Sequence, residues 1–432
     1  MNYCVGIDLG STTTKAVVLG ESGEVLGRGI TNSRSNYEIA CDVSVGEALI
    51  SARFGLLEEA LAAEGVEADR RKVQLEELEQ GFREEQYRGD LRELGSVMGR
   101  LLEAGTYSAQ EADAVTCVLD KMEQNAGSLY GRGKSRKSDF FRDLAGGEYL
   151  ELVEGEAKTR ALSFDRLVGL YDKAILEVEN TVAHDESFSS RIKAALGRIP
   201  EQDALLAKAI SAVVAMNLTK AGSVGTGYGR QTLPFAKEDI RSEILCHGLG
   251  AHAMFPNTRT VLDIGGQDTK AIQVDGNGIV TSFQMNDRCA AGCGRYLGYI
   301  ADEMNIGLHE LGPMACKSTR PVKINSTCTV FAGAELRERL SLGEKREDIL
   351  AGLHRAIILR AMSLLARSGG IADEFTFTGG VAKNPAAVEA LRKLIQENYG
   401  ERTLNISPDS IYTGALGAAM FAQREWRRRH CA

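Results

Sequence analysis

The sequence lacks the features that would direct a chain into a membrane, out of the cell or onto nucleic acid. No uninterrupted apolar run reaches the roughly 18 residues that a membrane-spanning helix needs, and no secretory leader is expected. The formal net charge of −8 over 432 residues leaves no excess of cations for a phosphate backbone. Residues 424–430 are basic, but a solvated helix end explains them. We therefore predict a cytoplasmic protein that binds neither membrane nor nucleic acid.

The cysteines predict a reducing compartment. There are nine of them in a chain without a recognisable leader, so disulfides are not expected. A hydrophobic content of 44% is enough for packed cores, and the length allows two or three domains. Most of the cysteines are interpreted as small apolar residues outside any metal site. These are Cys4, Cys41, Cys117, Cys246 and Cys431.

Residues 3–19 match neither the Gly-x-x-x-x-Gly-Lys loop nor the dinucleotide fingerprint, because no helix follows the turn directly. They predict a strand, a tight polar turn and a second strand. Asp8 ends the apolar run, and Gly10 allows backbone N–H groups to approach an anion. Hydroxyl residues and Lys15 complete the turn. The pattern predicts a hairpin that cradles a phosphate.

The same pattern recurs in residues 260–274, where Asp263, a pair of glycines and Lys270 follow an apolar strand in the same order. The chain is therefore predicted to be internally duplicated. A third glycine turn lies at residues 375–385, where Gly379 and Gly380 leave room for a flat adenine against the backbone.

Two further segments offer cysteines at the ends of predicted elements. Cys289 lies in the Gly/Ala-rich turn of residues 285–295, and Cys328 lies in residues 325–331. A helix N-terminus stabilises a thiolate or an anionic cluster, and an iron–sulfur cluster takes four cysteines. Two cysteines per chain indicate a cluster shared by two chains. Cys293 and Cys316 leave open a cluster held within one chain.

Together these motifs resemble an ATPase family that has the nucleotide-binding fold of actin, sugar kinases and Hsp70. Within that fold the chain is similar to the branch that contains activators of 2-hydroxyacyl-CoA dehydratases and ATP-binding subunits of ATP-dependent benzoyl-CoA reductase. The resemblance spans residues 1 to about 50 and 205 to 425. Its matching stretches are 6–15, 226–230, 242–248, 263–270, 286–295, 326–331, 379–384 and 412–420.

The resemblance implies a role for each matching residue. Asp8 would face Mg²⁺ through its waters, and Asp263 would face the metal or the attacking water, with Gln267 as the third catalytic residue. The phosphate contacts would be Gly10, Ser11, Thr12, Thr13, Lys15, Gly265, Gly266 and Gln267. Contacts with the nucleoside would come from Glu335, Gly379, Gly380 and Asn384. Cys289 and Cys328 would bind the shared [4Fe-4S] cluster.

The resemblance also predicts an α/β chain with two duplicated ribonuclease-H-like lobes. The first lobe would comprise residues 1–50 and 205–258, with a C-terminal helix over 411–428 packing back on it, and the second 259–410. Residues 51–204 replace the glycine-and-strand pattern with charged amphipathic sequence and predict a helical insertion. Its charges are interpreted as solvated helical faces, and its exposed helices are predicted to serve mainly in docking. The basic loop of residues 130–138 is a weak candidate for binding CoA phosphates or an acidic partner.

The insertion favours one branch of the family. Stand-alone activators resemble a shorter chain, whereas one ATP-binding subunit of benzoyl-CoA reductase resembles a longer chain with an insertion at this place. We therefore predict an ATP-hydrolysing electron-transfer subunit of that reductase, which uses ATP, Mg²⁺ and the shared cluster. Its implied partners are a second ATP-binding subunit, the subunits that reduce the aromatic acyl-CoA, and reduced ferredoxin. The alternatives are a homodimeric activator of a 2-hydroxyacyl-CoA dehydratase, and a kinase whose cysteines are core residues.

Overall fold

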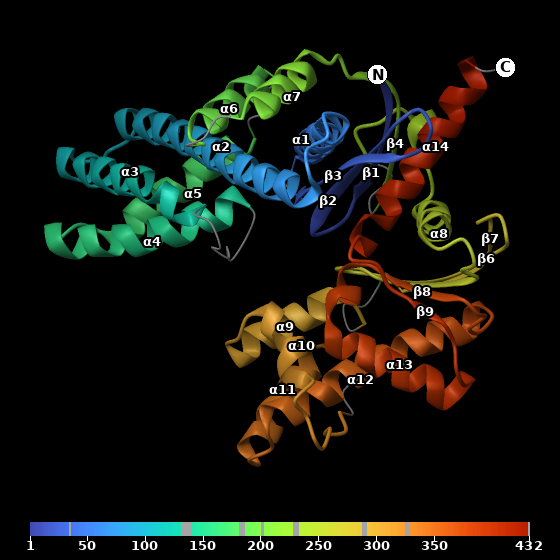
Figure 1. The fold of residues 1–432 in the computed structure, drawn as a ribbon. Coiled ribbons are helices and arrows are strands. Elements are labelled where there is room, and N and C mark those ends of the chain that lie inside the picture. Colours follow the sequence, from blue (N-terminus) through green and yellow to red (C-terminus); the bar gives the residue numbers. More distant parts are fainter. Residues whose placement is uncertain are drawn as a thin grey trace. The chain divides into compact units, whose positions relative to one another are not determined.

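The computed structural model describes residues 1–33, 36–130, 140–180, 186–199, 203–227, 233–286, 292–324 and 329–430. The chain forms two compact units (Figure 1). The first unit combines residues Met1–Val45 with Thr219–Ala432, and the second consists of Gly46–Leu218. The first unit contains both sheets, so it is the part that positions the predicted turns.

The first sheet has the order β3-β2-β1-β4. Its strands are β1 (Asn2–Leu9), β2 (Thr13–Leu19), β3 (Val25–Asn32) and β4 (Thr219–Gly227). β1 is buried almost along its whole length, as its apolar sequence requires, and it pairs antiparallel with β2 and parallel with β4. The β1–β2 register places Asp8 opposite Lys15. The first predicted hairpin is therefore present.

The second sheet repeats this hairpin and has the order β7-β6-β5-β8-β9. Its strands are β5 (Thr260–Ile264), β6 (Thr269–Val274), β7 (Val280–Asn286), β8 (Phe375–Thr378) and β9 (Leu404–Asn405). Here Asp263 lies opposite Lys270, and Thr378 of the parallel strand β8 is the other neighbour of Asp263. An Asp–Lys pair thus closes both hairpins.

Helices pack against each sheet. In the first lobe, α14 (Thr413–His430) lies along β1 and α8 (Glu243–Met254), as Figure 1 shows. Gly6 permits this approach, because a Cβ there would lie 2.0 Å from the carbonyl oxygen of Ala415. The second lobe carries α9 (Gly294–Met304), α10 (Leu308–Ala315), α11 (Thr329–Ser341), α12 (Arg346–Ser368) and α13 (Pro385–Tyr399). Three short 3₁₀ helices complete the unit: η1 (Lys237–Asp239), η2 (Gly380–Lys383) and η3 (Ser410–Tyr412).

Helix α12 is the centre of the second lobe's core. It packs with α10 and α13, and its buried side chains belong to the apolar cluster that also includes Phe375 and Phe377 of β8. Among the described residues, α12 is the one helix long and apolar enough to cross a membrane. Of its most apolar window, 61% is buried inside the protein. The apolar surface of α12 is therefore explained by the core.

The second unit is built from helices. They are α1 (Tyr37–Ala63), which starts in the first unit, α2 (Ala68–Ala104), α3 (Ala109–Leu129), α4 (Phe141–Arg160), α5 (Phe164–Glu179), α6 (Glu186–Gly197) and α7 (Ala204–Ala215). These helices enclose two apolar clusters of their own. The described part of residues 51–204 is therefore helical, within a unit whose bounds are Gly46 and Leu218.

Several charges of the second unit pair with one another, either within a helix or across neighbouring helices. Arg88 lies 2.8 Å from Glu84 and 2.9 Å from Glu123, and Arg142 lies 2.9 Å from Glu179. Ion pairs of this partly exposed kind contribute about 0–1 kcal/mol each. Such ion pairs are typical of helical faces that are exposed to solvent. The docking role of this unit stays a prediction.

Tyr149 should be indispensable to one of these cores. Its ring is fully buried, stacks on Tyr171 at a centroid distance of 4.6 Å, and its hydroxyl donates to the carbonyl of Leu167 at 3.0 Å. We expect Tyr149→Ala to destabilise the helical unit by about 3–5 kcal/mol, because the loss of an aromatic core residue leaves a cavity. Hydrogen exchange followed by mass spectrometry should then accelerate in α2 to α5, while β5 and β6 stay protected. Equal acceleration in the sheets would contradict two separate cores.

Candidate functional site

A cavity of about 720 Å³ opens in the first unit where the glycine turns meet. Both hairpins, the turn after β8 and the start of α9 contribute to its wall. Twelve of the predicted site residues line it: Asp8, Gly10, Ser11, Thr12, Thr13, Lys15, Asp263, Gly265, Gly266, Gly379, Gly380 and Asn384. The structure thus gathers turns that are far apart in the sequence.

Two glycines are required by close backbone approaches. A Cβ at Gly266 would lie 2.6 Å from Thr12 Oγ1, so the tips of the two hairpins come close to each other. Gly379 has φ +85°, and a Cβ there would lie 2.3 Å from the carbonyl oxygen of Ile264. That backbone conformation strongly favours glycine. Substitution at either position would therefore narrow or distort the cavity.

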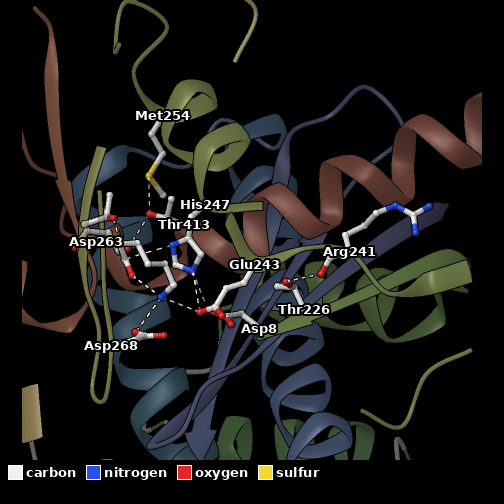
Figure 2. A network of polar contacts seen from close by, with 12 residues as sticks. Asp8, Thr226, Arg241, Glu243, His247, Met254, Asp263, Asp268 and Thr413 are labelled. Atoms are coloured by element: carbon white, nitrogen blue, oxygen red, sulfur yellow. Dashed lines mark hydrogen bonds and ion pairs between the residues drawn. The ribbon is translucent and has the colours of Figure 1, made fainter. Parts of the chain in front are cut away.

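The floor of the cavity is a buried network of charged side chains (Figure 2). Lys270 Nζ lies 2.8 Å from Glu243 Oε1, 2.9 Å from Asp268 Oδ1 and 3.2 Å from Asp263 Oδ2. Burial opposes its charge, but the three carboxylates outweigh burial and hold the pKa of Lys270 well above its usual value. Lys270 is therefore a permanent cation beneath the carboxylates.

Asp263 is held in one orientation and one charge state. Its Oδ1 accepts a hydrogen bond from the Thr378 hydroxyl at 2.9 Å, and its side chain is almost completely buried. Burial alone would raise its pKa, but His247 and Lys270 overcome this and keep the pKa well below the usual range. Asp263 is thus an ionised carboxylate that faces the cavity.

His247 connects the carboxylates of the two hairpins. Its Nδ1 lies 3.3 Å from Asp263 Oδ1, and its Nε2 lies 3.8 Å from Asp8 Oδ2 and 3.9 Å from Glu243 Oε1 (Figure 2). Burial lowers the pKa of the imidazole, but the charge of Asp263 outweighs burial and raises it overall. Gly414 at the start of α14 leaves room for this ring, because a Cβ there would lie 2.7 Å from His247 Nε2.

A cation could be held beside Asp8. Asp8, Glu243 and His247 offer ligand atoms that all lie within 4.8 Å of one another. Among the described residues, the buried Asp8 Oδ1 finds no hydrogen-bond partner, which is the state expected of a carboxylate oxygen that receives a ligand from outside the chain. Carboxylates and water are the ligands that Mg²⁺ prefers. The donor set therefore fits a hydrated divalent cation carried by a phosphate ligand.

Some predicted residues lie elsewhere. Of those that the structure describes, Gln267 and Glu335 do not line the cavity. With its oxygen turned towards the guanidinium, the Gln267 amide accepts from Arg295 Nη1 at 2.7 Å, and Glu335 lies 3.4 Å from Arg339 on its own helix. Cys289 and Cys328 fall outside the described residues, as do Tyr228–Arg230 and residues 131–139.

The structure adds residues to which the sequence patterns assign no role. Glu243 and His247 lie on one face of α8, four residues apart, and Asp268 lies in the second hairpin turn. In the sequence, Glu243 and His247 could have been recognised as a pair of ionisable residues at helical spacing in an otherwise apolar stretch. The apolar part of the cavity lining was also missed; it includes Leu297, Leu308, Val381, Pro385 and Ile411.

The start of α9 is tied to the second hairpin turn. The backbone N–H of Gly294 donates to the Gly265 carbonyl at 2.8 Å, and that of Arg295 donates to the Gly266 carbonyl at 2.8 Å. The buried hydroxyl of Thr269 donates to the Gly292 carbonyl at 2.7 Å. Thr269 also pairs with Asn286 in the sheet, so both ends of the segment between residues 286 and 292 are fastened to β6. A shift of the backbone at the second hairpin turn would therefore be transmitted through these hydrogen bonds to the start of α9.

The sequence comparisons agree on one family. The model of the BadF/BadG/BcrA/BcrD ATPase family matches residues 5–422. The (R)-2-hydroxyglutaryl-CoA dehydratase activating ATPase of Acidaminococcus fermentans is 43% identical over 205 residues, which are 48% of this chain and 76% of the relative. The 2-hydroxyisocaproyl-CoA dehydratase activator of Clostridioides difficile is 44% identical over 46% of this chain and 72% of its own. A benzoyl-CoA reductase subunit of Thauera aromatica is 33% identical over 40% of this chain and 62% of its own.

The structural comparisons support the predicted fold. The crystal structure of component A of the Acidaminococcus fermentans (R)-2-hydroxyglutaryl-CoA dehydratase aligns over 99% of both chains with a TM-score of 0.55 and 24% identity. The activator of the 2-hydroxyisocaproyl-CoA dehydratase from Clostridium difficile with bound ADPNP covers 99% of this chain and 97% of its own, with a TM-score of 0.53 and 23% identity. The two-lobed ATPase fold of actin, sugar kinases and Hsp70 is therefore confirmed.

Proposed function

Because the chain belongs to the BadF/BadG/BcrA/BcrD ATPase family, we propose that it hydrolyses ATP to drive electron transfer into a partner, as an activator of a 2-hydroxyacyl-CoA dehydratase. The observation that carries this proposal is the cavity in which two Asp–Lys hairpins meet around a buried charge network. The choice of partner rests on the relatives: two dehydratase activators are 43% and 44% identical, whereas the reductase relative is 33% identical. This choice replaces the reductase role favoured by the insertion.

The hairpins would divide the work on ATP between them. Gly10, Ser11, Thr12 and Lys15 line the cavity next to Asp8, and they offer backbone N–H groups, hydroxyls and an ammonium to the phosphates. Bound Mg²⁺ would neutralise phosphate charge, and Asp8 is the residue that would hold it through water. On the facing side, Asp263 would orient the attacking water, because Lys270 and His247 keep its carboxylate ionised. Arg295, which also lines the cavity, is placed to contact phosphate charge.

The cysteines would connect this chemistry to electron transfer. In the proposal, Cys289 and Cys328 supply two thiolates to a [4Fe-4S] cluster, and a second ATP-binding chain supplies the other two. Such a cluster stores the electron, and its exposure and hydrogen bonding set its potential. The bonds from Gly294 and Arg295 to the second hairpin turn support this idea, since they join the phosphate side of the cavity to the segment that precedes α9. Nucleotide exchange at Gly265 and Gly266 would then alter the surroundings of Cys289.

The proposal is tested by anaerobic electron delivery. The purified chain, reduced with dithionite and then freed of excess reductant, should regain the absorbance of the oxidised cluster within seconds when ATP and a dehydratase component are added together, and not with ADP or with either addition alone. A 2-hydroxyacyl-CoA should then be dehydrated. ATP hydrolysis without any electron transfer to the dehydratase, together with stable co-purification of aromatic acyl-CoA reducing subunits, would favour the reductase role instead.

A further inference from the structure

The cavity wall contains one side chain whose orientation is set from three sides. Asn384 lies between η2 and α13 and lines the cavity. Its Oδ1 accepts from the backbone N–H groups of Ala386 at 3.0 Å and Ala387 at 3.2 Å, so it caps α13. Both lone pairs of the amide oxygen are thereby used within the chain.

The amide nitrogen is fixed by a buried histidine. Asn384 Nδ2 lies 3.0 Å from Nε2 of His354, a residue of α12 that is 1% exposed. The other ring nitrogen, Nδ1, lies 2.7 Å from the Leu350 carbonyl. A carbonyl oxygen can only accept, so Nδ1 carries the proton, and Nε2 of the neutral ring accepts from Asn384. Burial lowers the pKa of His354, which favours this neutral form.

Helix α10 packs against the third side of the Asn384 amide. A Cβ at Gly312 would lie 2.6 Å from Asn384 Oδ1 and 2.7 Å from Pro385 Cδ. The absence of a side chain at Gly312 therefore lets α10 pack directly behind the amide. The amide is thus confined by packing as well as by hydrogen bonds.

We infer that His354 is a positioning residue that makes Asn384 present a single N–H donor to the nucleotide. The described residues supply one partner for Nδ2, so its second hydrogen is left for a ligand in the cavity. The part of the ligand that faces Asn384 is then a hydrogen-bond acceptor of the nucleoside, either an unprotonated ring nitrogen or a ribose oxygen. This inference rests on the proposal that the cavity binds ATP.

The test uses the complete chain and separates positioning from general packing. We expect His354→Leu to raise the dissociation constant and the KM for ATP about tenfold with kcat changed less than twofold, because one hydrogen bond is lost and the hairpin turns are untouched. His354→Gln keeps an acceptor near the position of Nε2, so it should stay within about threefold of the wild type. Ile357→Val, a buried change on the same helix, should lower stability without raising KM.

A double variant supplies the sharpest outcome. Asn384→Ser keeps an oxygen for the cap of α13 but removes the amide N–H groups. If His354 acts only through Asn384, adding His354→Leu to Asn384→Ser should raise KM no further. Additive effects, or an unchanged KM in His354→Leu, would overturn the inference. ATP analogues that each lack one ring nitrogen or one ribose hydroxyl then identify the acceptor. If the wild type binds all of them as tightly as ATP, the nucleoside contact is refuted.

The two proposals fail separately. A wild-type chain that does not bind ATP refutes the proposed function. A wild-type chain that binds and hydrolyses ATP, with His354→Leu indistinguishable from it, refutes only the role of His354.

Discussion

Replacing either hairpin aspartate with asparagine should lower ATP turnover by about 10²–10³-fold, the range seen when a preorganised charge at a reacting centre is removed. Asp8 would lose the charge that holds the hydrated cation, and its unpaired Oδ1 is the atom expected to face it. Asp263 would lose the charge that orients water, although Thr378 could still hydrogen-bond to the amide oxygen. Steady-state phosphate release measures the effect.

Asparagine is preferred to alanine for a structural reason. Lys270 is a buried cation beside Asp263, and deletion of a whole carboxylate side chain beside a buried charge can cost about 3–5 kcal/mol of stability. The isosteric amide retains the volume and leaves Glu243 and Asp268 in place for Lys270.

Asp409→Asn is the matched control, because Asp409 pairs with Arg28 at 3.0 Å and its side chain is 42% exposed. It should turn over ATP at the wild-type rate. Wild-type turnover in Asp8→Asn or Asp263→Asn, in protein whose circular dichroism spectrum is unchanged, would mean that ATP is not hydrolysed at this cavity.

The hairpins were predictable because their information is local. Asp8 and Lys15 lie seven positions apart, face each other across one turn, and recur as Asp263 and Lys270. A strand that ends in an acid, followed by glycine and hydroxyl residues, needs no tertiary contact to be recognised. The helical block was predictable in the same way, from apolar residues at helical spacing.

The network around the hairpins was not predictable from local pattern. Glu243 and His247 reach the site because α8 lies beside β6 and packs closely on α14, and nothing in residues 242–248 specifies those neighbours. Glu335 shows the opposite case. The resemblance assigns it a nucleoside contact, but it does not line the cavity and pairs with Arg339 on the same helix. Sequence spacing alone does not reveal which way a given side chain of α11 faces.

The prediction of the partner relied on the insertion, which makes this chain longer than a stand-alone activator. The insertion favoured the reductase branch, yet the dehydratase activators align at higher identity over about half of this chain. Because the helical unit has apolar cores of its own, such a block can be present or absent without altering the hairpins. It is therefore weaker evidence of the partner than the residues of the ATPase lobes.

Four cysteines should fall into two pairs that respond differently to replacement by serine: Cys289 with Cys328, and Cys293 with Cys316. If Cys289 and Cys328 supply the thiolates, and a second chain supplies the same pair, either Cys→Ser change removes two of four ligands from the shared cluster. We expect iron content and the low-temperature electron paramagnetic resonance signal to fall to near zero in anaerobically purified Cys289→Ser and Cys328→Ser. ATP binding should persist, because the hairpin turns are unchanged.

Cys293→Ser and Cys316→Ser are the matched controls, and the structure explains why they should keep their iron. Cys293 is 1% exposed at the N-cap of α9, and burial raises the pKa of its thiol, so the thiolate that iron requires is disfavoured there. Cys316 is largely exposed at the end of α10, where partial desolvation of the thiol together with Glu389 raises its pKa as well. A hydroxyl at either position should therefore leave the iron ligands unchanged. A full cluster in Cys289→Ser, or iron lost only in Cys293→Ser, would instead place the cluster within a single chain and refute the cluster shared by two chains.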